Sequence, residues 1–340
     1  MWKNPSFRRV VLVAITATGS SSLALGLQYG GNDISRFKFL SSAAATFVSS
    51  ASMIGANPAS CNAKDAASKE GSIKNNPRYI NQELEMQMDG IDNPRKRGML
   101  VQRFTGDSTP YSFPVTPVRL VKEWPKDKPP FEDRDFERQD ENDDGSFYAV
   151  PRLVYHIDEP AVASLTQYYR NNISAGSDIL DICSSWVSHY PLEFPKTMKR
   201  ISATGMNPLE LKFNDQLTDF EGRNLNKDPK LPYKDNSFDV VTCVVSIDYL
   251  NKPIQILKEV HRVLRPGGKV IISQSNRCFS TKAVRMWLTM NDRQHLDLIN
   301  GYLQYAGGFE PRKAFDISAT MPDNSYRDPM FIIEAVKETV

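Results

Sequence analysis

The residues from 231 to 275 constrain the fold of this chain more than any other stretch. Residues 238–245 form a short, valine-rich apolar run, as in a strand that is buried on both faces. Apolar residues then recur at helical spacing from 254 to 264, and the Arg-Pro-Gly-Gly run at 265–268 predicts the end of that helix and a turn. A second buried strand opens at 270–272. Together these segments predict a right-handed parallel strand–helix–strand unit.

Parallel sheets of this kind bind ligands beyond the carboxyl ends of their strands. The unit therefore predicts a site near residues 246–249 and near residues 273–277. Ser246 and Tyr249 are candidates at the rim of that site. For Tyr249, a place in the hydrophobic core is an equal alternative.

Further elements flank this unit on both sides. Residues 159–169 have a helical apolar face, with Asp158 as the expected cap and Pro160 in the first turn. Residues 178–183 and 200–204 read as two more buried strands. Two closing strands are expected near 314–317 and 330–336, after the Gly-Gly turn at 307–308.

Two sequence patterns carry a resemblance to a known superfamily. One is the lead-in LPYKDNSFD at 231–239, and the other is the run FDVV…YL…P…L.E..RVLRPGG from 238 to 268. Both are similar to the second half of class I S-adenosylmethionine-dependent methyltransferases. The resemblance implies an α/β, Rossmann-like sheet of seven mostly parallel strands, with the last strand inserted antiparallel. It also implies S-adenosylmethionine as the cofactor and a methyl acceptor as the second substrate.

A narrower resemblance covers residues 147–317. The pieces PRLVYHIDEPAVASLTQYY, DILDICSSWVSHYP, GMNPLEL and NLNKDPKLPYKDNSFDVV resemble methyltransferase-like proteins of bacteria and plastid-bearing organisms. These proteins carry an SSWVSH-type loop in place of the usual glycine-rich one. Membership implies no particular acceptor.

The loop after the first strand departs from the superfamily pattern. Asp181 stands at the usual acid, but Cys183, Ser185 and Val187 occupy the positions of the three glycines that let the backbone approach the cofactor's methionine part. By resemblance, Asp181, Cys183, Ser184 and Ser185 are expected to bind the cofactor, with small side chains still allowing approach and hydroxyls adding donors.

Further cofactor contacts follow from the same resemblance. Asn207 falls where the superfamily has the acid that binds the ribose, and Glu210 is a nearby acid that could compensate, although a helix-start acid is the simpler interpretation. Asn224 and Leu225 are expected beside the adenine, with a turn asparagine as the alternative for Asn224. Ser246 completes the expected cofactor set.

His189 is the first candidate for a general base, because it follows the cofactor loop and histidine titrates near neutral pH. His156 is the second choice, and Tyr249 is the other residue expected at the reacting groups. The alternative for His189 is a structural histidine bonded to the backbone. Trp186 and Tyr190 could form an aromatic wall beside the sulfonium or could pack in the core.

Charge and cysteine content argue against other classes of function. With 42 basic and 40 acidic residues the net charge is +2, which predicts no strongly basic nucleic-acid surface. The four cysteines show no C-x-x-C spacing, so neither a zinc site nor a disulfide framework is expected.

Residues 1–63 read as a targeting segment that is removed, because they hold five basic residues and one acid and contain two tandem basic-then-apolar units. A bipartite plastid address, with transfer to the thylakoid, is the first expectation. A mitochondrial or secretory address is the alternative. The apolar residues 10–27 are a weak membrane-span candidate, so membrane association is a further expectation.

Residues 64–146 are expected to form an irregular, partly disordered extension that ends in an acidic, solvated linker at 132–144. Part of its proline-rich stretch is expected to pack on the domain. The domain itself is expected to span residues 147–340.

The first functional hypothesis is a methyltransferase acting on a small-molecule acceptor. The second is a non-catalytic relative, in which the altered loop serves an assembly or regulatory role. A nicotinamide-dependent oxidoreductase is a remote third, because the chain lacks G-x-G-x-x-G and the matching acid.

Overall fold

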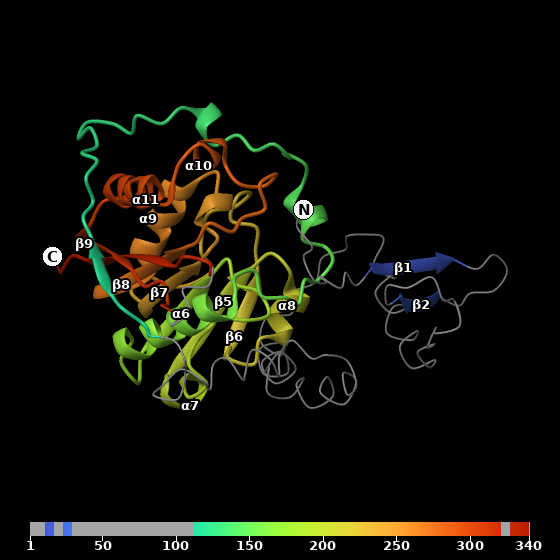
Figure 1. Cartoon of the computed structure of the whole chain (residues 1–340). Coiled ribbons are helices and arrows are strands. Elements are labelled where there is room, and N and C mark those ends of the chain that lie inside the picture. The colour runs from blue at the N-terminus through green and yellow to red at the C-terminus, as the bar shows by residue number, and fades with distance from the viewer. Residues whose placement is uncertain (1–10, 17–22, 29–111, 321–326, 340) are drawn as a thin grey trace, which may run out of the picture. The chain divides into compact units, whose positions relative to one another are not determined.

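The computed structural model describes residues 11–16, 23–28, 112–320 and 327–339 (Figure 1). In the amino-terminal unit, β1 (Val11–Thr16) pairs antiparallel with β2 (Leu23–Gln28). The remainder of the expected targeting segment, and residues 64–111, lie outside the described residues. The membrane-span expectation for residues 10–27 finds no support, because the described part of that segment is a pair of strands. No helix in the described ranges is long and apolar enough to cross a bilayer.

The second unit is built on an eight-stranded sheet in the order β3-β9-β10-β8-β7-β4-β5-β6. Its parallel part consists of β4 (Asp178–Ile182), β5 (Arg200–Gly205), β6 (Asp219–Gly222), β7 (Phe238–Val244) and β8 (Leu264–Gln274). The last strand, β10 (Phe331–Lys337), lies antiparallel between β8 and β9 (Phe309–Asp316), as expected.

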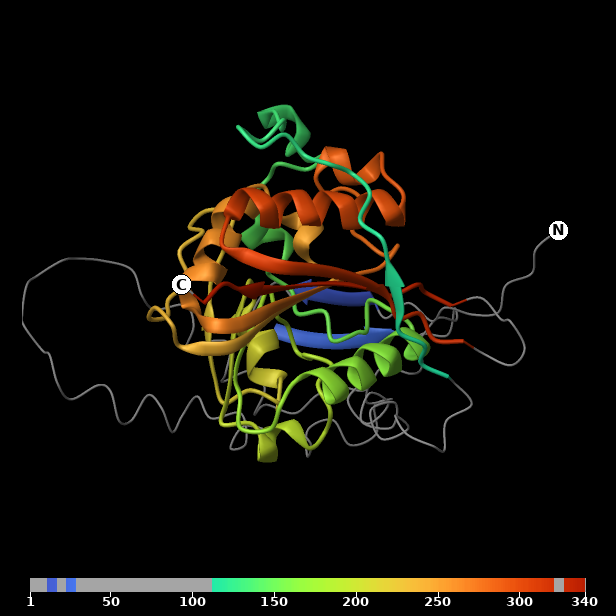
Figure 2. The ribbon, with the colours of Figure 1, turned by 90° about the vertical axis from the view of Figure 1, so that its left-hand side faces the viewer.

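The expected count of seven strands is one too few. A short additional strand, β3 (Thr116–Val118), pairs antiparallel with β9 at the edge of the sheet (Figure 2). Its central residue is Pro117, and proline is tolerated in an edge strand, where one side of the backbone needs no sheet partner. The proline-rich stretch thus contributes directly to the fold.

Helices cover both faces of the sheet (Figures 1 and 2). The strand side chains point alternately into two cores, one on each face of the sheet. Leu180 and Val241 pack with α9 (Pro253–Val263) and α11 (Asp292–Ala306). Ile179 and Val240 pack with α6 (Glu159–Asn172) on the other face. Each central strand is therefore apolar on both sides, which explains its continuous hydrophobic run. The short helices are α5 (Asp144–Phe147), α7 (Phe194–Thr197), α8 (Pro208–Phe213) and α10 (Arg285–Leu288), with 3₁₀ turns η2 (Asp133–Asp135) and η3 (Ile247–Tyr249).

Helices α6 and α9 form where the sequence predicts them. The Asp158 carboxylate accepts from the backbone N–H of Ala161 and caps α6. The expected turn at 265–268 is instead an irregularity inside β8: Leu264 pairs with Phe238, and the register shifts before Lys269 pairs with Val240. Gly267, with φ of 76°, supplies the left-handed backbone that this bulge requires.

The ordered chain of the second unit begins well before residue 147. Trp124 is buried, and its indole Nε1 donates to the carbonyl of Asp297 on α11. Asp144, expected in a solvated linker, is only 5% exposed and pairs with Arg138 and Lys282. Because Lys282 is distant in sequence, local charge density alone could not show that this acidic stretch packs onto the domain.

Candidate functional site

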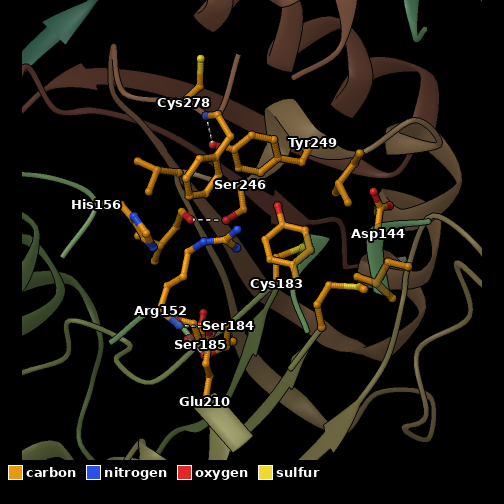
Figure 3. Close-up of a pocket in the computed structure, with 18 of the residues that line it drawn as sticks. Asp144, Arg152, His156, Cys183, Ser184, Ser185, Glu210, Ser246, Tyr249 and Cys278 are labelled. Carbon is orange, nitrogen blue, oxygen red and sulfur yellow. Dashed lines mark hydrogen bonds between the residues drawn. The ribbon is translucent and has the colours of Figure 1, made fainter. Parts of the chain in front are cut away.

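A cavity of about 250 Å³ lies at the carboxyl ends of β4, β5 and β7, where the strand–helix–strand unit predicts a site (Figure 3). Most of the candidate residues from the sequence line it, including His156 and Glu210; Asn207, Trp186 and Tyr190 do not. The expected cofactor-binding and reacting residues that line it are Asp181, Cys183, Ser184, Ser185, His189, Asn224, Leu225, Ser246 and Tyr249. They come from three separate segments, which lie at or after the ends of β4, β6 and β7 and which the sheet brings together.

Asp181 anchors the loop that follows β4. Its carboxylate is buried and accepts hydrogen bonds from the hydroxyls of Ser184 (2.6 Å) and Thr242 (3.0 Å). Burial raises the pKa of Asp181 to about 6, and the hydroxyl donors oppose that shift. The carboxylate therefore holds the loop to the neighbouring strand β7, whose Thr242 provides the second donor.

The loop keeps a glycine-like backbone without glycines. Cys183, at the first glycine position of the superfamily pattern, has φ of 56°, and His189 has φ of 57°. The Ser184 N–H donates to the Thr204 carbonyl (2.7 Å), and the Asn214 amide donates to the Ser185 carbonyl (3.1 Å). Hydrogen bonds from the surrounding elements thus stabilise a conformation that side-chain-bearing residues rarely adopt.

Asn207 does not reach the cavity. Its side-chain oxygen accepts from the backbone of Leu209 and Glu210 and caps α8, and its amide donates to the Tyr148 carbonyl (2.8 Å). Glu210, one helical turn later, lines the cavity instead. One Glu210 oxygen accepts from the Arg152 N–H (2.7 Å), and burial raises the pKa of this carboxyl. The acid beyond β5 is therefore Glu210, and Asn207 is a helix cap.

The adenine-side candidates lie beside one another at the cavity. Leu225 is buried and lines it. The Asn224 oxygen accepts from the backbone N–H groups of Asn226 and Lys227, which is the turn role that the sequence leaves open. Asn226 links this turn to the rest of the site, because its amide donates to the Asp144 carboxylate and to the Tyr249 carbonyl.

Ser246 and Tyr249 follow β7 at the rim. The Ser246 hydroxyl donates to the Val244 carbonyl (2.6 Å). The Tyr249 hydroxyl accepts from the Phe279 N–H (2.9 Å), and burial raises the pKa of this phenol. Tyr249 thus lines the cavity and holds the segment after β8 in place, and it is not part of the buried core that the sequence left open as the alternative.

His189 lines the cavity as a buried, neutral imidazole. Its Nδ1 has no hydrogen-bond partner within the described part of the chain. Burial, with a smaller contribution from His156, lowers the pKa of His189 to about 3. A group with so low a pKa is a weak proton acceptor, so the expected general-base role is at odds with its surroundings.

Trp186 and Tyr190 do not form the expected aromatic wall, since neither lines the cavity. The Trp186 Nε1 donates to the Val154 carbonyl, and the buried Tyr190 hydroxyl bonds Thr242. Both are packing residues. The aromatic rings at the cavity are those of Tyr249, which the sequence predicted, and of Tyr148, Tyr155 and Phe279, which sequence reasoning missed as site residues.

Apart from His156, which lines the cavity as expected for a site residue, the sequence gave no site role to the segment before α6. Arg138, Asp144, Tyr148 and Arg152 from this segment line the cavity. The aromatic and basic residues clustered in this segment were its only signal. Their approach to the site depends on tertiary contacts such as the ion pair between Asp144 and Lys282 (3.2 Å).

The environment of His189 predicts an acid sensitivity of folding. Its folded pKa of about 3 lies below the unfolded value of 6.5, so the unfolded chain binds the proton first as pH falls. Stability is therefore lost progressively from about pH 6.5 toward pH 3. Relative to His189→Asn, whose side chain tolerates the left-handed backbone, we expect the wild type to lose about 2 kcal/mol between pH 7 and pH 5.

Urea unfolding of both proteins at several pH values measures this difference. Asp181, whose raised pKa acts in the opposite direction between about pH 6 and 4, is common to both proteins and should largely cancel in the comparison. Parallel stability curves for the two proteins would contradict the assignment.

Part of the chain is similar to known proteins. Residues 190–272 match the family of methyltransferase domains. A demethylmenaquinone methyltransferase from Bacillus mycoides is 31% identical over 120 residues, which cover 31% of this chain and 48% of that protein. A ubiquinone/menaquinone biosynthesis C-methyltransferase from Bdellovibrio bacteriovorus is 35% identical over 107 residues, or 29% of this chain and 44% of that protein.

The chain thus spans about half the length of these relatives. Among solved structures, an S-adenosylmethionine-dependent methyltransferase from Thermotoga maritima is similar, with a TM-score of 0.39 and 17% identity over 53% of this chain and 90% of that one. The domain match and the relatives support the class I methyltransferase superfamily expected from the sequence.

Proposed function

We propose that this protein is an S-adenosylmethionine-dependent methyltransferase that acts on a small-molecule acceptor and belongs to the subgroup with an SSWVSH-type loop. The observation that carries the proposal is the cavity itself. At the carboxyl ends of adjacent parallel strands it gathers a buried acid (Asp181), a hydroxyl-bearing loop (Ser184, Ser185) and a second acid (Glu210). The methyltransferase-domain match at residues 190–272 supports the same cofactor.

The donor and acceptor set of the cavity fits this cofactor. Glu210 presents carboxylate oxygens that can accept from the two ribose hydroxyls, and Leu225 offers an apolar surface to the adenine. The loop after Asp181 would hold the methionine part. When bound, S-adenosylmethionine supplies an electrophilic methyl group. The protein's share of the chemistry is to hold the acceptor close to that group and to exclude water.

Both candidate histidine bases in the described cavity are weakened, because burial lowers the pKa of His156 as well as that of His189. His189 has a pKa of about 3, and the raised pKa of Tyr249 keeps its phenol protonated. The acceptor is therefore expected to arrive already nucleophilic. Because the similar proteins are named as demethylmenaquinone methyltransferases, acceptors of the demethylmenaquinone type are the first to assay for S-adenosylhomocysteine release.

Calorimetry with S-adenosylmethionine tests the proposal against the non-catalytic alternative. That alternative draws on Cys183 and on Val187, which replace glycines in the loop. Binding in the micromolar range is the expected result. Absence of binding would overturn the methyltransferase proposal and favour an assembly or regulatory role.

Glu210→Gln is expected to weaken S-adenosylhomocysteine binding about tenfold, because an amide can accept with only one of its two polar atoms. Calorimetry measures the change. Glu193→Gln is the matched control, since Glu193 lies outside the cavity and pairs with Arg170 on the surface. Equal affinity of both variants and the wild type would exclude Glu210 as a cofactor ligand.

The amino-terminal segment keeps its proposed role as a plastid address. Fusion of residues 1–63 to a fluorescent protein, with mitochondria and the secretory pathway as the alternative destinations, tests this directly. Retention of the fusion in the cytosol would contradict it.

A further inference from the structure

Arg152 carries a guanidinium that the fold leaves without a partner. Its Nη1 atom is buried, and within the described part of the chain it has no hydrogen-bond partner. The backbone N–H of the same residue donates to Glu210, which fixes the start of the side chain at the cavity wall. From there the side chain extends into the cavity toward Ser246 (Figure 3).

Arg152 differs in this respect from the other arginines at the cavity. Arg138 pairs with Asp144 and Glu141, Arg223 with Glu221 and Asp228, and Arg277 with Asp328. No carboxylate within the described ranges forms an ion pair with Arg152. Burying a guanidinium nitrogen without a hydrogen-bond partner is costly, so this half-buried side chain is suited to an anion supplied from outside the protein.

Aromatic rings surround the guanidinium without occupying its donors. Its central carbon lies 4.4 Å from the ring centre of Phe147, 5.3 Å from that of Phe279 and 5.8 Å from that of Tyr148. Such contacts stabilise the positive charge but supply no hydrogen-bond acceptor for the N–H donors. The rings thus stabilise the charge and leave the donors available for an oxyanion.

The surroundings also indicate which substrate supplies the anion. Phe279 follows β8 and is fixed by Tyr249, so the guanidinium faces the β8 side of the cavity. Leu225 and Asn224, the adenine-side candidates, follow β6 on the other side of the parallel strands. Tyr249 and Phe279 line the β8 side, which favours a flat, apolar molecule there.

We propose that Arg152 is the residue that binds an anionic oxygen group on the methyl acceptor, and that the acceptor is a planar aromatic molecule carrying one such group. The inference rests on the proposed function for the identity of the second substrate. It agrees with the weak basicity of His156 and His189, because an anionic acceptor requires no deprotonation. Arg152 is a binding and specificity residue, with no role in the transfer itself.

The test compares 2-naphthoate with its uncharged isostere 2-naphthamide, using the full chain in calorimetry with saturating S-adenosylhomocysteine. The wild type is expected to bind naphthoate at least about tenfold more tightly than naphthamide, as befits a charge-assisted hydrogen bond. Arg152→Gln should remove that preference while changing S-adenosylhomocysteine affinity less than about threefold. Arg134→Gln, which removes an exposed arginine outside the cavity, should keep the preference.

Three results would overturn the inference. They are a wild type without preference for naphthoate, an Arg152→Gln variant that keeps the preference, and a variant in which only S-adenosylhomocysteine binding is weakened at least tenfold. The third result would assign Arg152 to the cofactor's carboxylate. If thermal melting shows that Arg152→Gln is unfolded, Arg152→Lys is used in its place. This variant should bind naphthoate several-fold more weakly than the wild type, because lysine lacks the planar guanidinium. Unchanged affinity for naphthoate would contradict the proposal.

Failure of the proposed function gives a different signature. In that case the wild type binds neither S-adenosylmethionine nor S-adenosylhomocysteine. The naphthoate preference, measured without cofactor, still reports on Arg152 by itself. The two outcomes are therefore distinguishable in one set of titrations.

Discussion

Gly205→Ala is expected to destabilise the domain by roughly 1–3 kcal/mol and to weaken S-adenosylhomocysteine binding at least about tenfold. A Cβ at this position, at the end of β5, would lie 2.1 Å from the carbonyl oxygen of Ser184. Neither backbone can yield easily, because the Ser184 N–H is bonded to Thr204 next to the glycine. The loop after β4 must therefore move away from β5. This loop is the proposed binding site for the methionine part of the cofactor, so its movement should weaken binding.

Urea unfolding and calorimetry measure the two effects separately. Gly145→Ala is the control, because its Cβ would meet only the exposed side chain of Asp143, at 3.1 Å. That variant should retain cofactor binding. A Gly205→Ala protein with wild-type affinity would show that the approach of loop and strand is unimportant for the site.

Asp144→Ala is expected to lower the free energy of unfolding by about 3 kcal/mol. The Asp144 carboxylate bonds Arg138 at 2.8 Å and Lys282 at 3.2 Å, and the Lys282 side chain is only 1% exposed. Removing the acid leaves the buried positive charges of Arg138 and Lys282 with fewer negatively charged partners. The loss should fall at the lower end of the range for broken buried pairs, because Lys282 retains Asp140 and Arg138 retains Glu141.

A double-mutant cycle with Lys282→Met makes this prediction specific. If the pair interacts as the structure indicates, the double variant should lose at least about 1 kcal/mol less than the sum of the single variants. Asp235→Ala removes an exposed partner of Arg262 and should cost under about 1 kcal/mol. Additive losses at Asp144 and Lys282 would contradict the buried ion pair. Hydrogen exchange should also show faster opening of residues 138–147 in Asp144→Ala.

Features with a local physical cause could be predicted from the sequence. The runs of β7 and β8 and the stripe of α9 follow from period and apolarity, and Asp158 caps α6 through a hydrogen bond three residues away. The place of the site also follows, because parallel strands end at a common edge. The antiparallel position of β10 came from resemblance, and the pairing with β8 and β9 agrees with it.

The chemistry within the site depended on contacts that no spacing reveals. Asn207 and Glu210 are three residues apart, and only the packing of α8 decides that Glu210 meets the cavity while Asn207 caps the helix. His189 has an ordinary histidine pKa in the unfolded chain, and burial, with a smaller contribution from His156, lowers it to about 3. Trp186 and Tyr190 have the ring types of a cation-binding wall, but their polar atoms bond Val154 and Thr242 in the core.

The sequence by itself determined the strand–helix–strand unit at 231–275, because hydrophobic period and turn chemistry act over neighbouring residues. It also determined which edge of the sheet holds the site. Only the tertiary structure decided that residues 112–147 complete the domain and that Arg152 enters the cavity unpaired. Those outcomes rest on burial and on partners far away in the chain, such as Lys282 for Asp144 and Phe279 for Arg152, and such pairings leave no periodic signal in the sequence.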